Sequence, residues 1–535
     1  MRCSYLYSVA YSKKLRWLQT FKKKTYNSIK YSLSSLIEIT LLMSSTVFNV
    51  PKVAAAIVTY NHREPVLKLI ATLEQQKIPT FVTENNGIDG AAEAIRNQFP
   101  MVSLLASSTN LGGCGGFNCA ALAALSSGCE YLIFIDDDAF PEVDCIAQLT
   151  DFLDANPDYI FAAPAIYITS QPDTLQEAGG DVDFNLSHPV EAWYRFHVKP
   201  ELPSVIDIGY ASACCLMVRA DALREMGVMD WSYFIFSDDV DLCLRLRHRF
   251  AKKGACVTTA KAFHDFPWAK PFAPMRLYFF QRNGLRLISN HRKSGQIKSL
   301  FTALMRLHRR IFYSGLIGDY EIKQSLLDAF KDAWKGKFGN WDSWITFAKD
   351  RTKVKSSFFE NQNIKNILID ISIEDFEPAM IKLLKKLKCS ASIDILCDES
   401  RVEHHQANSN YNQVYARKIG FISPLKILPI LLGKKYDLVV TDANMEARRA
   451  TAMCGKYATI FHNDELFMAA NRPYLAVVAH LLSLPVGLFM ALLTINHFRK
   501  PFPVGKPPAE AEALLKYIGI DPEIGQPFAR LNNND

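Results

Sequence analysis

From Val53 onward, short apolar runs alternate with segments of helical spacing. The runs VAAAIVT, TFVTE, VSLLA and YLIFID are largely apolar and are followed by polar residues, which is typical of buried parallel strands. The segment EPVLKLIATLEQQ, between the first two runs, repeats apolar residues every three or four positions, which predicts a helix. The pattern therefore predicts a βαβαβαβ series, in which the strands form a parallel sheet covered by helices.

Polar residues lie at the ends of these four predicted strands. Because ligands bind at the carboxyl ends of parallel strands, these side chains are expected to converge on one crevice. The residues are Thr59, Tyr60 and Asn61; Glu84, Asn85 and Asn86; Asn110 with Gly112 and Gly113; and Asp136, Asp137 and Asp138.

The three consecutive aspartates repel one another. Each carboxylate raises the pKa of its neighbours unless water or a counter-charge lies among them. A solvated acidic turn and a cation site both satisfy this requirement. For a cation site, oxygen ligands suit Mg or Mn.

The segment NLGGCGGFN is rich in glycine and precedes the helical pattern CAALAALSS. Glycine permits positive φ and close backbone approach, and the N-terminus of the following helix would face the crevice. The spacing differs from the GxGxxG fingerprint of dinucleotide sites. We expect a loop whose N–H groups contact a pyrophosphate or sugar, with an ordinary tight turn as the alternative.

A second acidic group lies in FIFSDDVDLCLRLR, where Asp238, Asp239 and Asp241 open a predicted helix. Acids in a first helical turn are stabilised by the helix dipole, which could alone explain one or two of them. A carboxylate in this position could also act as a general base.

Composition narrows the class of protein. A chain of 535 residues with 49% hydrophobic and 21% charged residues is globular and long enough for two or three domains. The net charge of +7 comes from residues 1–50, which hold eight Lys or Arg and the single acid Glu38. The remainder is neutral, which disfavours a nucleic-acid binder, while the basic extension could adhere to anionic lipid.

The 12 cysteines include no CxxC pair and fall largely in apolar segments, which suits free thiols in a reducing compartment. No secretory signal is evident, so we expect a cytoplasmic protein.

The chain beyond residue 295 changes character. Residues 296–360 predict a helical connector, and residues 361–470 predict a second, smaller α/β domain that contains the strands KNILIDIS, ASIDILCDES and KYDLVVTDAN. Residues 471–535 contain the apolar stretch Tyr474 to Phe498, which is interrupted by Pro485. That stretch could cross a bilayer, lie in its surface as a helix or hairpin, or form a buried helix pair.

The motifs VTYN, ENNG, NLGGCGGFN, FIDDDAFPEVD, FSDDVDLCLR, FHDFPWAKP and LYFFQRNGLR, in this order, resemble family 2 glycosyltransferases of the GT-A fold. The resemblance covers about half of the chain and is strongest to the galactofuranosyltransferase branch. It implies a GT-A domain over residues 51–295, with a nucleotide-sugar-binding sheet that is parallel at its core. It also implies an inverting transfer, favoured from UDP-galactofuranose, to a glycan or glycolipid acceptor at the inner face of the cell membrane.

The resemblance assigns a role to each site residue. Asp136, Asp138 and His264 would hold Mn or Mg, and Asp136 and Asp137 would also contact the nucleotide sugar together with the polar residues at the other strand ends. Asp239 would be the base, with Asp238 and Trp268 beside the acceptor and Asp241 structural. A packed core histidine is the alternative for His264.

This sequence departs from the family pattern at two places. His62 precedes Arg63 where relatives often have arginine, and Ala211 with Ser212 replaces paired tryptophans, so Trp231 or Trp268 would supply an acceptor wall unless they are core residues. Other readings of the chain are a rhamnosyl- or other hexosyltransferase, a sugar nucleotidylyltransferase, and a catalytically silent scaffold.

Overall fold

The computed structural model describes residues 50–186, 189–192, 200–264, 274–343, 353–370, 376–386, 391–399, 402–406, 411–417, 429–442, 451, 454–462, 465–468 and 473–521. Residues 51–535 group as one compact unit, and the basic extension, residues 1–49, lies outside the described residues.

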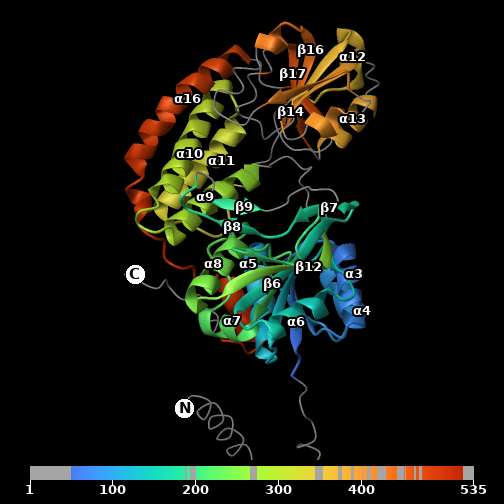
Figure 1. Ribbon diagram of the computed structural model, residues 1–535, viewed down its shortest axis with the longest axis vertical. Coiled ribbons are helices and arrows are strands. Elements are labelled where there is room, and N and C mark those ends of the chain that lie inside the picture. Colours follow the sequence, from blue (N-terminus) through green and yellow to red (C-terminus); the bar gives the residue numbers. More distant parts are fainter. Residues whose placement is uncertain are drawn as a thin grey trace, which may run out of the picture. The chain divides into compact units, whose positions relative to one another are not determined.

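A mixed sheet forms the N-terminal part of this unit, with strand order β10-β12-β6-β11-β4-β1-β2-β3 (Figure 1). The pairs β4–β1, β1–β2 and β2–β3 are parallel, which confirms the predicted parallel core, whereas β11 is antiparallel to both β4 and β6. Two short strands extend the sheet, β5 on β12 and β7 on β6, and β8 pairs separately with β9. The strands are β1 (Val53–Thr59), β2 (Thr80–Glu84), β3 (Ser103–Ala106), β4 (Tyr131–Asp136), β5 (Ala139–Pro141), β6 (Tyr159–Ile168), β7 (Gln171–Glu177), β8 (Gly180–Val182), β9 (Val190–Ala192), β10 (Val205–Ile208), β11 (Cys215–Arg219) and β12 (Lys253–His264).

Both faces of this sheet are buried, as the continuous apolar runs predict. Successive residues of β1 alternate between two cores: Ala54 and Ala56 pack with α5 on one face, and Ala55 and Ile57 pack with α3 and α6 on the other. The helices of this part are α3 (Arg63–Gln75), α4 (Ala91–Gln98), α5 (Gly112–Ser126), α6 (Cys145–Ala155), α7 (Ala220–Met226) and α8 (Asp238–Phe250).

The glycine-rich segment is not the loop that we expected. Helix α5 begins at Gly112 itself, and Gly112 is the only one of the four glycines with positive φ, at 77°. Close packing explains their presence: a Cβ on Gly116 would lie 2.2 Å from Cγ2 of Val58, and one on Gly112 would lie 2.2 Å from the carbonyl oxygen of Phe234. The N-terminus of α5 therefore approaches both β1 and the segment that precedes α8.

Three helices follow the sheet, namely α9 (Pro274–His291), α10 (Ile297–Ile317) and α11 (Tyr320–Lys335). Residues C-terminal to the apolar stretch return to this first part of the chain through η3 (His497–Arg499) and α17 (Ala509–Tyr517). Phe498, Ala511 and Leu515 belong to the same hydrophobic core as α5, and the backbone N–H of Gly505 donates to Asp230. Residues 498–521 are thus part of the fold of the first domain.

A second, smaller sheet confirms the predicted α/β domain, with strand order β15-β14-β13-β16-β17-β18. All its described pairs are parallel except β17–β18. Its elements are β13 (Asn366–Asp370), β14 (Ser392–Asp398), β15 (Gln413–Arg417), β16 (Tyr436–Asp442), β17 (Gly455–His462) and β18 (Glu465–Met468), with helices α12 (Ser356–Gln362), α13 (Phe376–Lys386) and α14 (Val402–Gln406).

The apolar stretch forms one helix, α16 (Pro473–Thr494), with Pro485 inside it. The hairpin and helix-pair readings of this segment are therefore wrong. Helix α16 packs along α10 (Figure 1). Among the described residues, no helix is both long and apolar enough to cross a membrane.

Candidate active site

The triple aspartate follows β4 and meets His264 at the end of β12. The pairing of β12 with β5 places His264 opposite Ala139, one residue beyond Asp138. Nε2 of His264 lies 3.2 Å from Oδ1 of Asp138, and one ligand atom each from Asp136, Asp138 and His264 lie within 4.8 Å of one another. Strand pairing thus brings together residues more than 120 positions apart in the sequence.

Electrostatics in this cluster favour a cation. Burial raises the pKa of Asp136 to about 7. The charge of His264 opposes this rise, and the charges of Asp138 and Asp137 add to it. Burial acts in the same direction on Asp138, but the hydrogen bond and charge of His264 outweigh it and hold the pKa of Asp138 below its usual value. Two carboxylate oxygens and one imidazole nitrogen form a ligand set that fits Mn²⁺, and Mg²⁺ less well because Mg²⁺ prefers oxygen.

A second histidine contacts the same aspartates. Nδ1 of His62 lies 3.0 Å from Oδ1 of Asp137 and 3.9 Å from Oδ2 of Asp138. Burial raises the pKa of Asp137, and the hydrogen bond and charge of His62 offset part of this rise. His62, which interrupts the family motif in the sequence, therefore supplies positive charge next to the triple aspartate when it is protonated.

Asp238 and Asp239 are the first two residues of α8, as the sequence predicts. Burial raises the pKa of Asp239 to about 6, and burial together with the charge of Asp239 raises the pKa of Asp238 well above its usual range. Both carboxyl groups of the pair are therefore shifted toward the protonated form, and Asp239, with a pKa of about 6, is the candidate base.

One short backbone segment connects the two acidic groups. The N–H of Asp136 donates to the carbonyl of Cys214 at 3.1 Å, and the N–H of Ala213 donates to Oδ2 of Asp239 at 3.4 Å. The charge of Asp239 is close enough to raise the pKa of Asp136. The candidate base and the candidate metal ligands consequently face one site.

The fold and this site agree with a family match. Residues 55–227 match glycosyl transferase family 2. The chain carries a family 2 glycosyltransferase domain and is a glycosyltransferase. The match includes β1 to β11 and the triple aspartate, whereas α8 and His264 lie beyond it.

Two curated relatives are similar to the glycosyltransferase domain. Galactofuranosyltransferase GlfT1 of Mycolicibacterium smegmatis is 26% identical over 215 residues, which cover 39% of this chain and 69% of the relative. The N-acetylglucosaminyl-diphospho-decaprenol L-rhamnosyltransferase of Mycobacterium tuberculosis is 27% identical over 209 residues, which cover 35% of this chain and 68% of the relative. A crystal structure of GalNAc-T7 with UDP, GalNAc and Mn²⁺ aligns with a TM-score of 0.36 and 13% identity, over 54% of this chain and 56% of that one.

In the glycosyltransferase domain, the polar residues at the strand ends divide into two groups. Tyr60 is exposed, and Asn61 and Asn86 adopt positive φ in the turns that follow β1 and β2. Asn85, in contrast, is buried: its side-chain amide donates to the carbonyl of Gly112 and accepts from the N–H of Leu111. Because both ends of this amide are bonded to the start of α5, Asn85 positions that helix. Its contact with the nucleotide stays a prediction.

Glu84, Asn110 and Gly113 complete the strand-end set. Glu84 accepts from the N–H of Gly87 at 2.5 Å, and burial raises the pKa of Glu84. Asn110 accepts from the N–H of Gly112 at 2.8 Å, and Gly113 lies in the first turn of α5. These contacts order the turns around the N-terminus of α5, where backbone N–H groups can face an anion.

A strained loop leads into the candidate base. Phe234, Phe236 and Ser237 all have positive φ, between 63° and 68°, which is costly for residues other than glycine. The side-chain amide of Asn283 on α9 lies within 3.0 Å of the carbonyls of Tyr233, Ile235 and Phe236 and donates to them. The QRN motif of α9 therefore fixes the loop that aims Asp238 and Asp239.

Asp241 has a different environment. Burial alone would raise its pKa, but the charge of Arg245 and the hydrogen bond with His291 hold the pKa well below its usual range. Arg245 donates to it at 2.7 Å, and His291 Nε2 lies 2.7 Å away. This buried network supports the structural interpretation of Asp241.

The acceptor side is less complete. Trp231 belongs to the hydrophobic core, so it is not the sugar-stacking residue. Trp268 lies outside the described residues.

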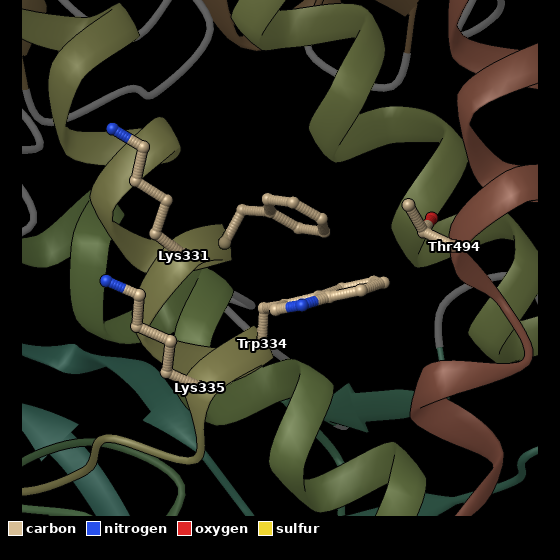
Figure 2. A pocket seen from close by; sticks show the side chains of 5 residues that line it. Lys331, Trp334, Lys335 and Thr494 are labelled. Carbon is tan, nitrogen blue, oxygen red and sulfur yellow. The ribbon is translucent and has the colours of Figure 1, made fainter.

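A hollow of about 210 Å³ is lined by Phe330, Lys331, Trp334, Lys335 and Thr494 (Figure 2). None of the predicted site residues lines this hollow, and it belongs to α11 and α16 rather than to the strand ends.

Sequence reasoning missed two residues of β7. Gln176 Nε2 lies 3.1 Å from Nδ1 of His264, and the charge of the buried Glu177 helps to raise the pKa values of both His264 and Asp239. The sequence signal is weak because β7 is short and its motif QPDTLQE alternates poorly. Only the pairing of β7 with β6 brings these side chains to the site.

Proposed function

We propose that this glycosyltransferase moves galactofuranose from UDP-galactofuranose to a hydroxyl of a growing, lipid-linked glycan, with inversion at the anomeric carbon. The single observation that supports this most strongly is the junction of two acidic groups: Asp136, Asp138 and His264 on one side, and Asp239 on the other, held together by Ala213 and Cys214.

On the donor side, Asp136, Asp138 and Nε2 of His264 would hold a divalent cation, Mn²⁺ or Mg²⁺. When bound, such an ion supplies positive charge that stabilises the leaving diphosphate. The dipole of α5, which begins at Gly112, would be the second source of positive potential at the site. Tyr60, Asn61 and Asn86 would contact base and ribose.

On the acceptor side, the Asp239 carboxylate would take the proton of the attacking hydroxyl. The oxygen then forms a bond to the anomeric carbon as the bond from that carbon to the diphosphate breaks, and UDP leaves with the electron pair. The raised pKa of Asp239, about 6, strengthens it as a base while leaving it ionised near pH 7. Asp238 would lie beside the acceptor.

A rhamnosyl donor is the second candidate. The rhamnosyltransferase relative is as similar to this chain as the galactofuranosyltransferase is, at 27% against 26% identity. Both transfers use the same arrangement of donor carboxylates and base, so the pocket around the sugar ring decides between them.

The experiment is a donor panel. The full chain is incubated with UDP-galactofuranose, UDP-galactopyranose, UDP-glucose and a nucleotide-linked rhamnose, each with Mn²⁺, with Mg²⁺ or with EDTA. Released nucleotide diphosphate is measured with and without a synthetic galactoside acceptor. We expect acceptor-stimulated release of UDP from UDP-galactofuranose only; stimulated release from the rhamnose donor would select the second candidate, and no release from any donor would overturn both.

We further propose that the enzyme works at the cytoplasmic face of a membrane. An acceptor attached to lipid presents its hydroxyl at that surface. The rhamnosyltransferase relative is named for a decaprenol-linked substrate, which supports the same location.

A further inference from the structure

Helix α16 has an inverted distribution of residues. A helix that packs on a protein in water normally turns its apolar residues inward. On α16 the residues packed inward are small or polar, including Ala479, His480, Ser483, Gly487 and Thr494, all of them buried. The outward residues, which we name the leucine stripe, are Val478, Leu481, Leu482, Leu488, Phe489, Leu492 and Leu493, and all of them are exposed.

The inward face of α16 is fully used by α10. A Cβ on Gly487 would lie 2.6 Å from the carbonyl oxygen of Met305, so the two helices approach as closely as glycine allows. Thr494 Oγ1 lies 3.2 Å from Nε2 of His308. These specific contacts fix the rotation of α16 about its axis. The residues of the leucine stripe are exposed and therefore lie on the side of the helix away from α10.

The stripe is continuous along the helix. Its members recur at three- and four-residue spacing, and Phe489, Leu492 and Leu493 are each about 60% exposed. Single exposed apolar residues are normal on protein surfaces, whereas a contiguous stripe of seven on one helix marks an interaction surface.

Charge indicates which partner the stripe fits. Residues 473–500, which hold the stripe, contain no acidic residue, and the two cations that follow the helix, Arg499 and Lys500, are exposed. Two copies of this surface would bring like charges together. A bilayer surface with anionic headgroups offers the opposite charge and an acyl boundary into which the leucines can insert.

We propose that the leucine stripe of α16, supported by the exposed cations Arg499 and Lys500 that follow the helix, is the face by which this enzyme docks on anionic lipid. The helix lies in the surface, with its apolar side in the acyl boundary and its polar side on α10. This inference deepens the proposed membrane location, but it depends on no residue of the catalytic site.

The test compares two matched pairs of substitutions in the full chain. Phe489→Gln with Leu492→Gln removes two exposed apolar side chains from the stripe, and Met101→Gln with Val143→Gln removes two from the sheet domain, where they are 86% and 82% exposed. Flotation is measured with phosphatidylcholine vesicles with or without 30% phosphatidylglycerol, at low salt and at 0.5 M NaCl. Melting temperatures confirm that all variants are folded.

We expect the wild type and the Met101/Val143 variant to float with anionic vesicles, and the Phe489/Leu492 variant to partition at least about tenfold less at both salt concentrations. The double substitution of Arg499→Gln and Lys500→Gln should weaken binding about fivefold for each charge removed. We expect this loss only with anionic vesicles and only at low salt. Binding through the basic residues 1–49 depends on charge and is screened at 0.5 M NaCl. The binding that remains at high salt therefore measures the contribution of the stripe.

Three results would overturn the proposal. The first is equal flotation of the Phe489/Leu492 variant and the wild type, and the second is flotation that disappears entirely at 0.5 M NaCl. The third is a wild type that is dimeric without lipid, with a monomeric Phe489/Leu492 variant, which would assign the stripe to a second copy. Donor hydrolysis is also measured on the same proteins without vesicles. Hydrolysis by a protein that does not float would contradict the membrane proposal alone, whereas its absence would contradict the proposed function.

Discussion

Gln176 lies 3.1 Å from Nδ1 of His264, on the side of the ring opposite to the Nε2 atom that faces Asp138. Oε1 of Gln176 is buried and has no hydrogen-bond partner among the described residues. If the amide is turned so that Oε1 faces the ring, Oε1 accepts a hydrogen bond from Nδ1–H. Nε2 then keeps a lone pair that is directed at the cation site. Gln176 is thus placed to orient the histidine.

Gln176→Leu should therefore weaken metal binding by about 10- to 100-fold, because His264 loses the partner that fixes its tautomer. The measurement is the Mn²⁺ concentration that restores half-maximal donor hydrolysis, which should rise while the rate at saturating Mn²⁺ recovers. Gln176→Glu should retain most of the affinity, and Gln171→Leu, on the exposed end of the same strand, should change nothing. An unchanged Mn²⁺ requirement in Gln176→Leu would assign Gln176 to packing.

Asp138→Asn should lower transfer by about two to three powers of ten, since the leaving diphosphate loses stabilisation of its developing charge. EDTA should abolish transfer by the wild type, and excess Mn²⁺ should restore it. Asp144→Asn, a nearby exposed aspartate outside the cluster, is the matched control. Full activity in excess EDTA would remove the metal from the mechanism.

Asp239→Asn should lower kcat by about 10²- to 10⁴-fold while UDP binding survives, because the amide keeps its shape and cannot accept a proton. UDP affinity measured by calorimetry separates the two effects. If kcat stays near normal, the base lies elsewhere, and Asp238 is the next candidate.

The pH dependence of the wild type should report the same carboxyl group. Since burial raises the pKa of Asp239 to about 6 and the base must be ionised, kcat/KM should be constant above that pH and fall about tenfold per unit below it. The profile is measured from pH 4.5 to 8 at saturating Mn²⁺. An acid limb near pH 4 would indicate an unburied carboxylate as the base.

Asp241→Asn should cost about 3 kcal/mol of unfolding free energy, because Arg245 and His291 lose a buried charged partner. The pKa of Asp241 is lowered in the folded state, so its contribution is present above the unfolded value of about 3.9 and is lost as the pH falls below it. Urea unfolding at pH 7 and at about pH 2.5, well below the unfolded pKa, should show the difference from wild type shrinking in acid. Glu225→Gln, which breaks the exposed pair with Arg249, should cost less than about 1 kcal/mol.

Leu515→Ala should destabilise the protein by about 2 to 4 kcal/mol, because Leu515 is fully buried in the core shared with α5. Tyr517→Ala, 88% exposed in the same helix, should be neutral. The melting temperatures of the two variants are measured and compared with that of the wild type. Equal melting temperatures for both variants would show that α17 folds independently of the glycosyltransferase domain.

The sequence by itself predicted the parallel core of the first sheet, because short apolar runs that end in polar residues and alternate with helical segments are typical of strands buried on both faces. It also indicated the triple aspartate and the start of α8 as candidate sites, since adjacent carboxylates require water or a counter-charge around them. The second α/β domain followed from the same periodicity.

Only the tertiary structure decided which of these groups meet. His264 reaches Asp138 through the pairing of β12 with β5, and Gln176 reaches His264 through the pairing of β7 with β6; both depend on register between distant strands, which local pattern does not encode. The sequence showed that α16 is apolar, but its small and polar residues could equally have faced water. Their close packing on α10 is a contact between residues almost 200 positions apart, and it is what leaves the leucine stripe outside.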